Sequence, residues 1–140
     1  MKTLRIFTLL FFAAGFIAAC SNSESSQSVE QQVDGLISEQ KFDEALALIN
    51  DQAASEEMTT LKENVHLQHG IYLIYNADPS QMRENANNAL REFIAVLEIN
   101  PDNEKARAET QQILNIYRTF PDRQPAEDVL EQLRDLGFQI

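Results

Sequence analysis

The chain has 140 residues, 44% of them hydrophobic and 24% charged, and this length suits a single domain. Its formal net charge of −11 makes nucleic acid a poor partner, because an acidic surface repels phosphate and offers it no basic stripe. One cysteine, Cys20, cannot form an internal disulfide, so the chain is not a small scaffold held by disulfide bridges.

Residues 1–19 have the parts of a secretory signal. Lys2 and Arg5 form a basic start, and residues 6–19 are almost wholly apolar. As a helix this apolar segment covers about 21 Å, which is shorter than the roughly 30 Å hydrocarbon core of a bilayer. A short apolar segment that ends in small residues is typical of a signal peptide, so we expect residues 1–19 to be removed.

A four-residue motif closes this segment. Ile17, Ala18, Ala19 and Cys20 place an aliphatic residue and two small residues before a cysteine. The pattern resembles the lipobox of bacterial lipoproteins. The resemblance implies that Cys20 receives a diacylglyceryl thioether, that cleavage occurs before it, and that its new amine is acylated. Two or more acyl chains anchor a protein stably. The alternative is an ordinary signal followed by a chance cysteine.

Residues 21–28 contain no apolar side chain and are rich in serine, so we expect residues 20–28 to be a lipidated cysteine and a solvated tether. Ser21, rather than aspartate, follows Cys20. Under the sorting convention of enterobacteria this resembles an outer-membrane lipoprotein. The expected location is the cell envelope, on the outer membrane and facing the periplasm.

From Val29 onward, apolar residues recur at spacings of three and four, which is the period of an amphipathic helix, and no segment alternates convincingly as a strand does. The pattern predicts an all-α fold with six helices: from Val29, from Phe42, from Ser55 to about Tyr75, from Asp78 to Asn100, from about Asp102 through Tyr117, and from Pro125 to Gly137. The core stripe expected on the fourth helix is Met82, Ala86, Ala89, Leu90, Phe93 and Leu97.

Several helix ends are predicted from capping residues. Ser55 is a good N-cap for the third helix, and Asp78 with Gln81 can form a capping box at the start of the fourth. Gly137 suits a left-handed residue at the end of the sixth helix, where Phe138 can fold back.

Residues 40–46 read Gln-Lys-Phe-Asp-Glu-Ala-Leu, and Ala89, Phe93 and Pro101 follow at the spacings of a small residue, an aromatic residue and a terminating proline. Together with Gly70, these residues resemble the tetratricopeptide repeat. The resemblance implies that two helices approach closely at Gly70. The resemblance covers about Val29 to Tyr117 and implies a short solenoid of about three antiparallel hairpins over residues 29–140. Residues 76–88 make that unit about seven residues longer than a standard repeat, and a generic helical bundle is the alternative.

The resemblance implies a partner groove lined by Asn64, Leu67, Ile71, Ile74 and Tyr75. Three of these residues, Leu67, Ile71 and Ile74, form a second apolar stripe on the third helix. A helix that is apolar on two sides is either buried on both or presents one side to a partner. The alternative to a groove is therefore that the sixth helix or residues 76–88 cover the stripe. Lys105, Gln112 and Asn115 are expected to continue the groove with polar side chains.

No catalytic centre and no cofactor are expected. Cys20 is taken by lipid, and the serines cluster in a tether that cannot hold a nucleophile in place. Glu63, His66 and His69 have a spacing that can present metal ligands on one helix face. A metal site needs three or four convergent ligands, so a polar helix face is the favoured interpretation.

The sequence thus predicts a membrane-anchored, non-catalytic adaptor that binds envelope proteins or peptide segments, for example as an accessory factor in outer-membrane or secretion and pilus assembly. One alternative is a metal- or small-ligand-binding lipoprotein built around Glu63, His66 and His69. Another is a passive structural lipoprotein.

Overall fold

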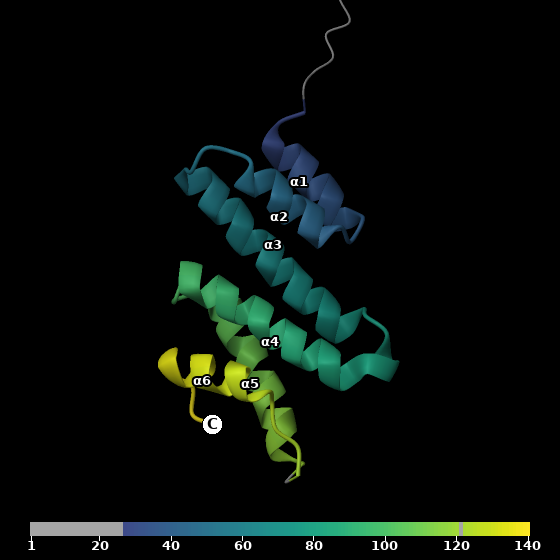
Figure 1. The fold of residues 1–140 in the computed structure, drawn as a ribbon, viewed down its shortest axis with the longest axis vertical. Helices are drawn as coiled ribbons and strands as arrows, with labels where there is room; N and C mark the ends of the chain where they lie inside the picture. The colour runs from purple at the N-terminus through teal and green to yellow at the C-terminus, as the bar shows by residue number, and fades with distance from the viewer. Residues whose placement is uncertain (1–26, 121) are drawn as a thin grey trace, which may run out of the picture.

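The computed structural model describes residues 27–120 and 122–140, and every regular element in that part of the chain is helical. The elements are α1 (Val29–Ser38), α2 (Phe42–Asn50), α3 (Glu56–Tyr75), the 3₁₀ turn η1 (Pro79–Gln81), α4 (Met82–Ile99), α5 (Glu104–Arg118) and α6 (Glu127–Asp135). They follow one another along the long axis, from α1 and α2 at the top of Figure 1 to α5 and α6 at the bottom. The predicted all-α fold with six helices is confirmed. Among these helices, none is both long enough and apolar enough to cross a membrane.

Side-chain caps explain where several helices begin. Ser28 and Gln31 form a capping box before α1, in which each backbone N–H donates to the other side chain at 3.2 Å. Ser55 caps α3, as predicted, by accepting from the N–H of Met58 at 3.2 Å. The side chain of Asn103 caps α5 in the same way. Each cap satisfies backbone donors that have no partner inside the helix.

The start of α4 differs from the prediction. Asp78 Oδ1 accepts from the N–H of Ser80 at 2.9 Å, but the chain then forms η1, and α4 begins only at Met82. Gln81 makes no side-chain cap, so the predicted capping box is wrong. The carbonyl oxygen of Asp78 accepts both from the N–H of Gln81 at 3.1 Å and from Asn85 Nδ2 at 2.9 Å, which favours the tighter 3₁₀ turn.

The end of α6 follows the prediction. Gly137 has a φ of +84°, in the left-handed region that glycine adopts without steric cost. The N–H of Phe138 donates to the carbonyl of Leu133 at 2.9 Å, and that of Gly137 to the carbonyl of Arg134 at 2.9 Å. This pair of bonds is a Schellman motif. Phe138 packs against the core, with the guanidinium carbon of Arg107 lying 5.6 Å from its ring centre.

The buried side chains form two hydrophobic cores, one on each side of α3. The N-terminal core joins α1, α2 and one face of α3 through Val33, Phe42, Ala45, Ile49, Leu61 and Val65. The C-terminal core joins α4, α5 and α6 through Ala89, Leu90, Phe93, Ile94, Val96, Leu97, Ala106, Ile113, Leu114, Val129 and Leu133. The second face of α3 packs on this C-terminal core through the partly buried Leu67, Ile71, Leu73 and Ile74. Because α3 contributes to both cores, it holds the two halves together.

Gly70 sets the distance between α3 and α4. A Cβ atom placed on Gly70 would lie 2.5 Å from Cε1 of Phe93, which is far inside van der Waals contact. Phe93 is fully buried there. The close helix approach predicted at Gly70 is therefore present, and the aromatic ring fills the space that the glycine leaves.

The last pair of helices departs from the expected hairpin. The helix pairs α1–α2 and α3–α4 pack side by side (Figure 1). Helix α6 instead packs mainly on α4, and its backbone approaches α5 less closely. Two polar contacts hold it there: Arg91 of α4 with Asp128 of α6 at 2.9 Å, and Asn87 Oδ1 with the N–H of Ala126 at 2.7 Å.

Candidate functional site

An open apolar groove of about 640 Å³ lies where the end of α3, the start of α4 and the end of α5 meet. Its lining includes Leu73, Ile74 and Tyr75 from α3, Met82, Arg83 and Ala86 from α4, Gln112, Ile113, Ile116 and Tyr117 from α5, and Phe120 and Arg123 from the segment beyond α5. This volume is in the range of about 300–1,000 Å³ that ligand clefts occupy in proteins.

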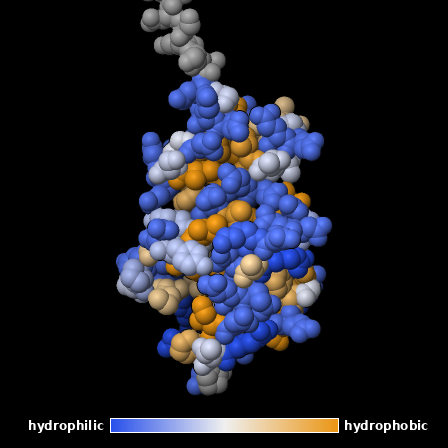
Figure 2. Space-filling view, turned by 180° about the vertical axis from the view of Figure 1, so that it is seen from behind, coloured by the Kyte–Doolittle hydropathy of each residue, from blue (hydrophilic) through white to orange (hydrophobic). Residues whose placement is uncertain are grey.

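The groove gathers most of the exposed large apolar side chains of the described residues. Tyr75 is 54% exposed, Met82 69%, Ile116 53% and Phe120 47%, and all four line the groove. Ile140 is also exposed and lines a smaller adjoining pocket of about 290 Å³ together with Phe120. Figure 2 shows one face of the molecule, on which apolar surface occurs in patches between polar side chains. Single exposed apolar residues need no explanation, but a contiguous group of them marks an interaction site.

A series of polar contacts fixes the position of Tyr75 at the groove. Its hydroxyl donates to Glu109 Oε2 at 2.9 Å and accepts from Gln112 Nε2 at 3.2 Å. Glu109 also pairs with Lys105 at 2.7 Å. The hydrogen bond to the Glu109 carboxylate raises the pKa of Tyr75, and burial and the negative charge of Glu109 add to this. The tyrosine therefore remains a neutral donor that ties α3 to α5, which preorganises one wall of the groove.

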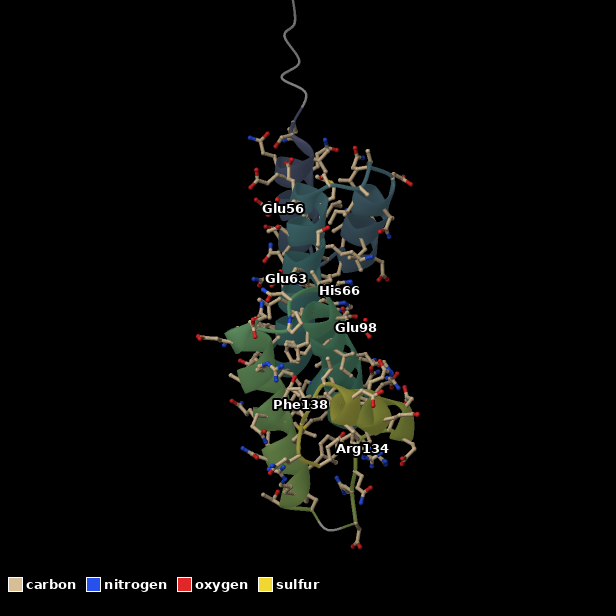
Figure 3. The ribbon with its side chains drawn as sticks, turned by 90° about the vertical axis from the view of Figure 1, so that its left-hand side faces the viewer. Glu56, Glu63, His66, Glu98, Arg134 and Phe138 are labelled. Carbon is tan, nitrogen blue, oxygen red and sulfur yellow. The ribbon has the colours of Figure 1, made fainter. Side chains whose placement is uncertain are left out.

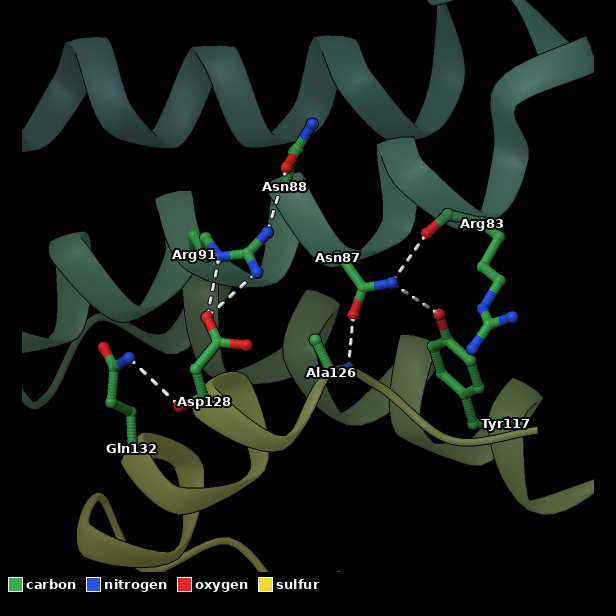
Figure 4. A network of polar contacts seen from close by, with 8 residues as sticks. All are labelled: Arg83, Asn87, Asn88, Arg91, Tyr117, Ala126, Asp128 and Gln132. Atoms are coloured by element: carbon green, nitrogen blue, oxygen red, sulfur yellow. Dashed lines mark hydrogen bonds and ion pairs between the residues drawn. The ribbon is translucent and has the colours of Figure 1, made fainter.

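Asn87 organises the opposite wall (Figure 4). Its Nδ2 donates to the carbonyl of Arg83 at 2.9 Å and, more weakly, to the hydroxyl of Tyr117 at 3.4 Å, while its Oδ1 accepts from the N–H of Ala126. Burial raises the pKa of Tyr117, and the charge of Arg83 and the hydrogen bond from Asn87 oppose that rise. One asparagine of α4 thus links the groove residue Tyr117 to the start of α6.

The structure brings only part of the predicted groove together. Ile74 and Tyr75 line it, and so does Gln112 from α5. Leu67 and Ile71 pack against the C-terminal core instead, and Asn64 lies outside the groove lining. Leu67 and Ile71 are therefore covered by the C-terminal core, whereas Ile74 both packs on that core and lines the groove. Lys105 and Asn115 also lie outside the lining.

Most residues of the groove were not predicted from the sequence. The sequence predicts Met82 in the core stripe of the fourth helix, but Met82 lies at the first position of α4 and is 69% exposed. Ile116 and Phe120 were not singled out. Ile116 is apolar beside the buried pair Ile113 and Leu114, and Phe120 follows four residues later, so the end of α5 and the segment after it carry more apolar side chains than one buried face needs.

The structure does not bring Glu63, His66 and His69 together. Glu63 Oε1 accepts from Asn100 Nδ2 at 2.9 Å and from Asn103 Nδ2 at 2.7 Å, at the turn between α4 and α5. His66 instead contacts Glu92, and Figure 3 labels Glu63 and His66 on the ribbon. In residues 27–120 and 122–140, no group of three or more His, Cys, Asp or Glu side chains is placed to hold a metal ion. The predicted trio is thus a set of contacts between helices.

Glu92 of α4 is the partner of both histidines. His66 Nδ1 lies 2.7 Å from Glu92 Oε2, and His69 Nδ1 lies 3.2 Å from Oε1. His69 also stacks on Phe42, with ring centres 4.5 Å apart. Burial of the Glu92 carboxylate acts to raise its pKa, but the hydrogen bonds and charges of the two histidines outweigh it and hold the pKa at about 2. The cluster therefore joins α2, α3 and α4.

The predicted lipidation site, Cys20, lies outside the described residues. Comparisons of this chain with protein-family models, with curated proteins and with solved structures find no match.

Proposed function

We propose that this protein is a non-catalytic adaptor of the bacterial envelope, held on a membrane by lipid on Cys20, which binds a segment of a partner protein in the groove between α3, α4 and α5. The observation that carries the proposal is the gathering of Tyr75, Met82, Ile116 and Phe120 at one groove. Tyrosine, phenylalanine and methionine are enriched at the centres of protein interfaces. A small chain that leaves four such side chains exposed together forgoes burial that its own cores could use.

The helical pairing supports a repeat-like architecture within this proposal. Helices α1–α2 and α3–α4 pack as successive pairs, and the close approach of Gly70 to Phe93 suits the small and aromatic positions of a tetratricopeptide repeat. In such repeats the first helix of each pair lines the binding surface. Here α3 and α5 would be those helices, and both contribute to the groove.

Lipid on Cys20 would give the adaptor its location. The motif Ile17-Ala18-Ala19-Cys20 and the short apolar segment before it support this part of the proposal. Confinement to a membrane surface raises the effective concentration of the groove near membrane-bound partners. Intact mass spectrometry of the protein isolated from a bacterial membrane tests it. We expect an N-terminal Cys20 that carries acyl chains, and an unmodified Cys20 would contradict the anchor.

A photo-crosslinking side chain at Ile116, in the full chain in its own membranes, tests the adaptor. We expect it to capture one or two envelope proteins that the same group at Ala47, exposed on α2, does not capture. The double variant Met82→Asp/Ile116→Asp should lose that capture, because buried apolar contacts are replaced by charges. Both residues are more than half exposed, so the variant should fold, as circular dichroism can verify. Capture that is equal at both positions, or that survives the variant, would exclude the groove.

A further inference from the structure

We infer that the segment bound in the groove carries large apolar side chains flanked by carboxylates, and that Arg83 and Arg123 pair with those carboxylates. This inference rests on the proposed function, because it assigns the chemistry of the partner that the groove receives. It follows from how charge is distributed around the groove and from which arginines are already occupied.

The groove has the opposite charge character to the rest of the chain. The whole sequence has 22 acidic and 11 basic residues. The groove lining contains two arginines and no aspartate or glutamate. Glu109, which reaches the groove residue Tyr75, is neutralised by Lys105 at 2.7 Å. A partner that meets this surface therefore faces positive charge in an otherwise acidic protein, and complementary acidic groups are favoured there.

The two groove arginines are also the two whose guanidinium groups have no polar partner among the described residues. The other four described arginines are each occupied: Arg91 by Asp128, Arg107 by the carbonyl of Pro101, Arg118 by Asn115 and the carbonyl of Gln139, and Arg134 by Glu127. Arg83 forms neither an ion pair nor a side-chain hydrogen bond within the described part of the chain. Arg123 only lies over the ring of Phe120, 5.6 Å from its centre, although Asp122 precedes it in sequence.

The shape and composition of the groove favour a peptide segment over a small amphiphile. Ligand clefts typically bury about 70–90% of a small ligand, whereas the rim residues Tyr75, Met82 and Ile116 are more than half exposed. Tyrosine, phenylalanine, methionine and arginine are enriched at protein interfaces, and lysine, aspartate and glutamate are depleted, which is the composition found here. Arginine also binds a carboxylate through two parallel hydrogen bonds, which fixes the register of a bound chain.

Apolar contacts and ion pairs contribute differently to binding. Apolar side chains of the partner fill the groove beside Ile116 and Phe120 and supply most of the affinity. Carboxylates at the rim pair with Arg83 and Arg123, which steers the encounter and selects acidic segments over basic ones. Binding is therefore expected to weaken with salt, since rim charges are screened over about 8–10 Å at physiological ionic strength.

Selection from a phage library of random 16-residue peptides tests this inference, with the full chain held in phosphatidylcholine nanodiscs and with empty nanodiscs used to remove background. We expect the selected peptides to combine leucine, isoleucine or aromatic residues with aspartate or glutamate within a few positions. Arg83→Glu/Arg123→Glu should weaken their binding about tenfold or more, and selection on that variant should favour lysine and arginine instead. Lys41→Glu/Lys62→Glu makes the same change in net charge away from the groove and should leave binding unchanged.

The outcomes separate the inference from the proposed function. Peptides that depend on Met82 and Ile116 but carry no acidic residues would overturn the inference and leave the peptide groove in place. Peptides that bind the Met82→Asp/Ile116→Asp and Arg83→Glu/Arg123→Glu variants as well as they bind the parent protein would overturn both the inference and the proposed function. Native mass spectrometry that finds an anionic lipid or a second copy of the chain in the groove would overturn the inference as well, because either occupant replaces the acidic segment.

Discussion

At the scale of single residues, Gly70 determines how closely α3 and α4 approach. Replacement by alanine puts a methyl group 2.5 Å from Phe93 Cε1, and Phe93 is fully buried and cannot move aside freely. Overpacking of this kind typically costs about 1–3 kcal/mol. We expect Gly70→Ala to lower the free energy of unfolding by that amount, as measured by urea denaturation.

Gly35→Ala is the matched control. Gly35 lies inside α1, and a Cβ atom there meets nothing within 4 Å. Alanine stabilises a helix interior by about 0.5–1 kcal/mol relative to glycine, so this variant should be slightly more stable. Equal destabilisation by both substitutions would mean that Phe93 does not limit the approach of α3 to α4.

The ionisation of Glu92 links the stability of the fold to pH. Its pKa of about 2 lies below its ordinary value of 4.5, because His66 and His69 outweigh the effect of burial. A carboxylate whose pKa is lowered by folding stabilises the fold above its unfolded pKa. That contribution is lost as the pH falls from about 4.5 to about 2.

We expect Glu92→Gln to lower the free energy of unfolding by about 1–3 kcal/mol at pH 7 and to have little effect at pH 2. Urea unfolding of both proteins between pH 2 and pH 7 measures this difference. Glu131→Gln, on the exposed side of α6, should follow the parent protein at every pH. A difference for Glu92→Gln that does not depend on pH would show that packing, and not charge, accounts for the role of Glu92.

At the scale of elements, the position of α3 between the two cores explains why this helix carries two apolar stripes. The stripe of Leu61 and Val65 packs in the N-terminal core, and the stripe of Leu67 and Ile71 packs on the C-terminal core. Both stripes were visible in the sequence. Whether the second stripe stays exposed could not be derived from periodicity, because its coverage depends on where α4 lies.

Asn87 of α4 is one of the residues that hold the start of α6. Removal of the Asn87 side chain leaves the N–H of Ala126 without its acceptor, and an unsatisfied buried donor costs about 1–3 kcal/mol. We expect Asn87→Ala to speed amide hydrogen exchange in α6 while α1 and α2 keep their protection. Glu98→Ala, at an exposed position of the same helix, is the control and should leave α6 unchanged. Faster exchange throughout the chain in Asn87→Ala would contradict a local role.

At the scale of the whole molecule, the two cores differ in size and share α3. The N-terminal core is the smaller of the two and lies at one end of the stack (Figure 1). Opening the N-terminal core exposes fewer buried side chains than opening the C-terminal core. Local opening is therefore expected to begin at α1 and α2.

Two large-to-small substitutions test this order. Val33→Ala, in the N-terminal core, should speed hydrogen exchange in α1 and α2 and leave α4 protected. Leu97→Ala, in the C-terminal core, should cost about 2–5 kcal/mol and reduce protection in all six described helices. If Val33→Ala lowered protection in α4 as much as in α1, the chain would open as one unit.

Local patterns in the sequence predict most of the secondary structure. Apolar spacings of three and four predict the six helices, and Ser55 and Gly137 mark a start and an end that the structure confirms. The error at Gln81 arose because a capping box and a 3₁₀ turn can start from the same residues. The choice between them depends on Asn85, which is one helical turn into α4 and donates to Asp78.

Most residues of the candidate site could not be predicted from the sequence, because the site is built from three helices. Tyr75 and Ile74 were identified on one helix, but Met82, Ile116 and Phe120 become neighbours only when α4 and α5 pack beside α3. The same holds for Glu92, which is 23 residues beyond His69 and meets it only across α3 and α4. Local sequence determines which residues are helical and which face is apolar, since those properties depend on near neighbours. Tertiary packing decides which apolar and charged side chains remain uncovered, because coverage depends on residues far away along the chain.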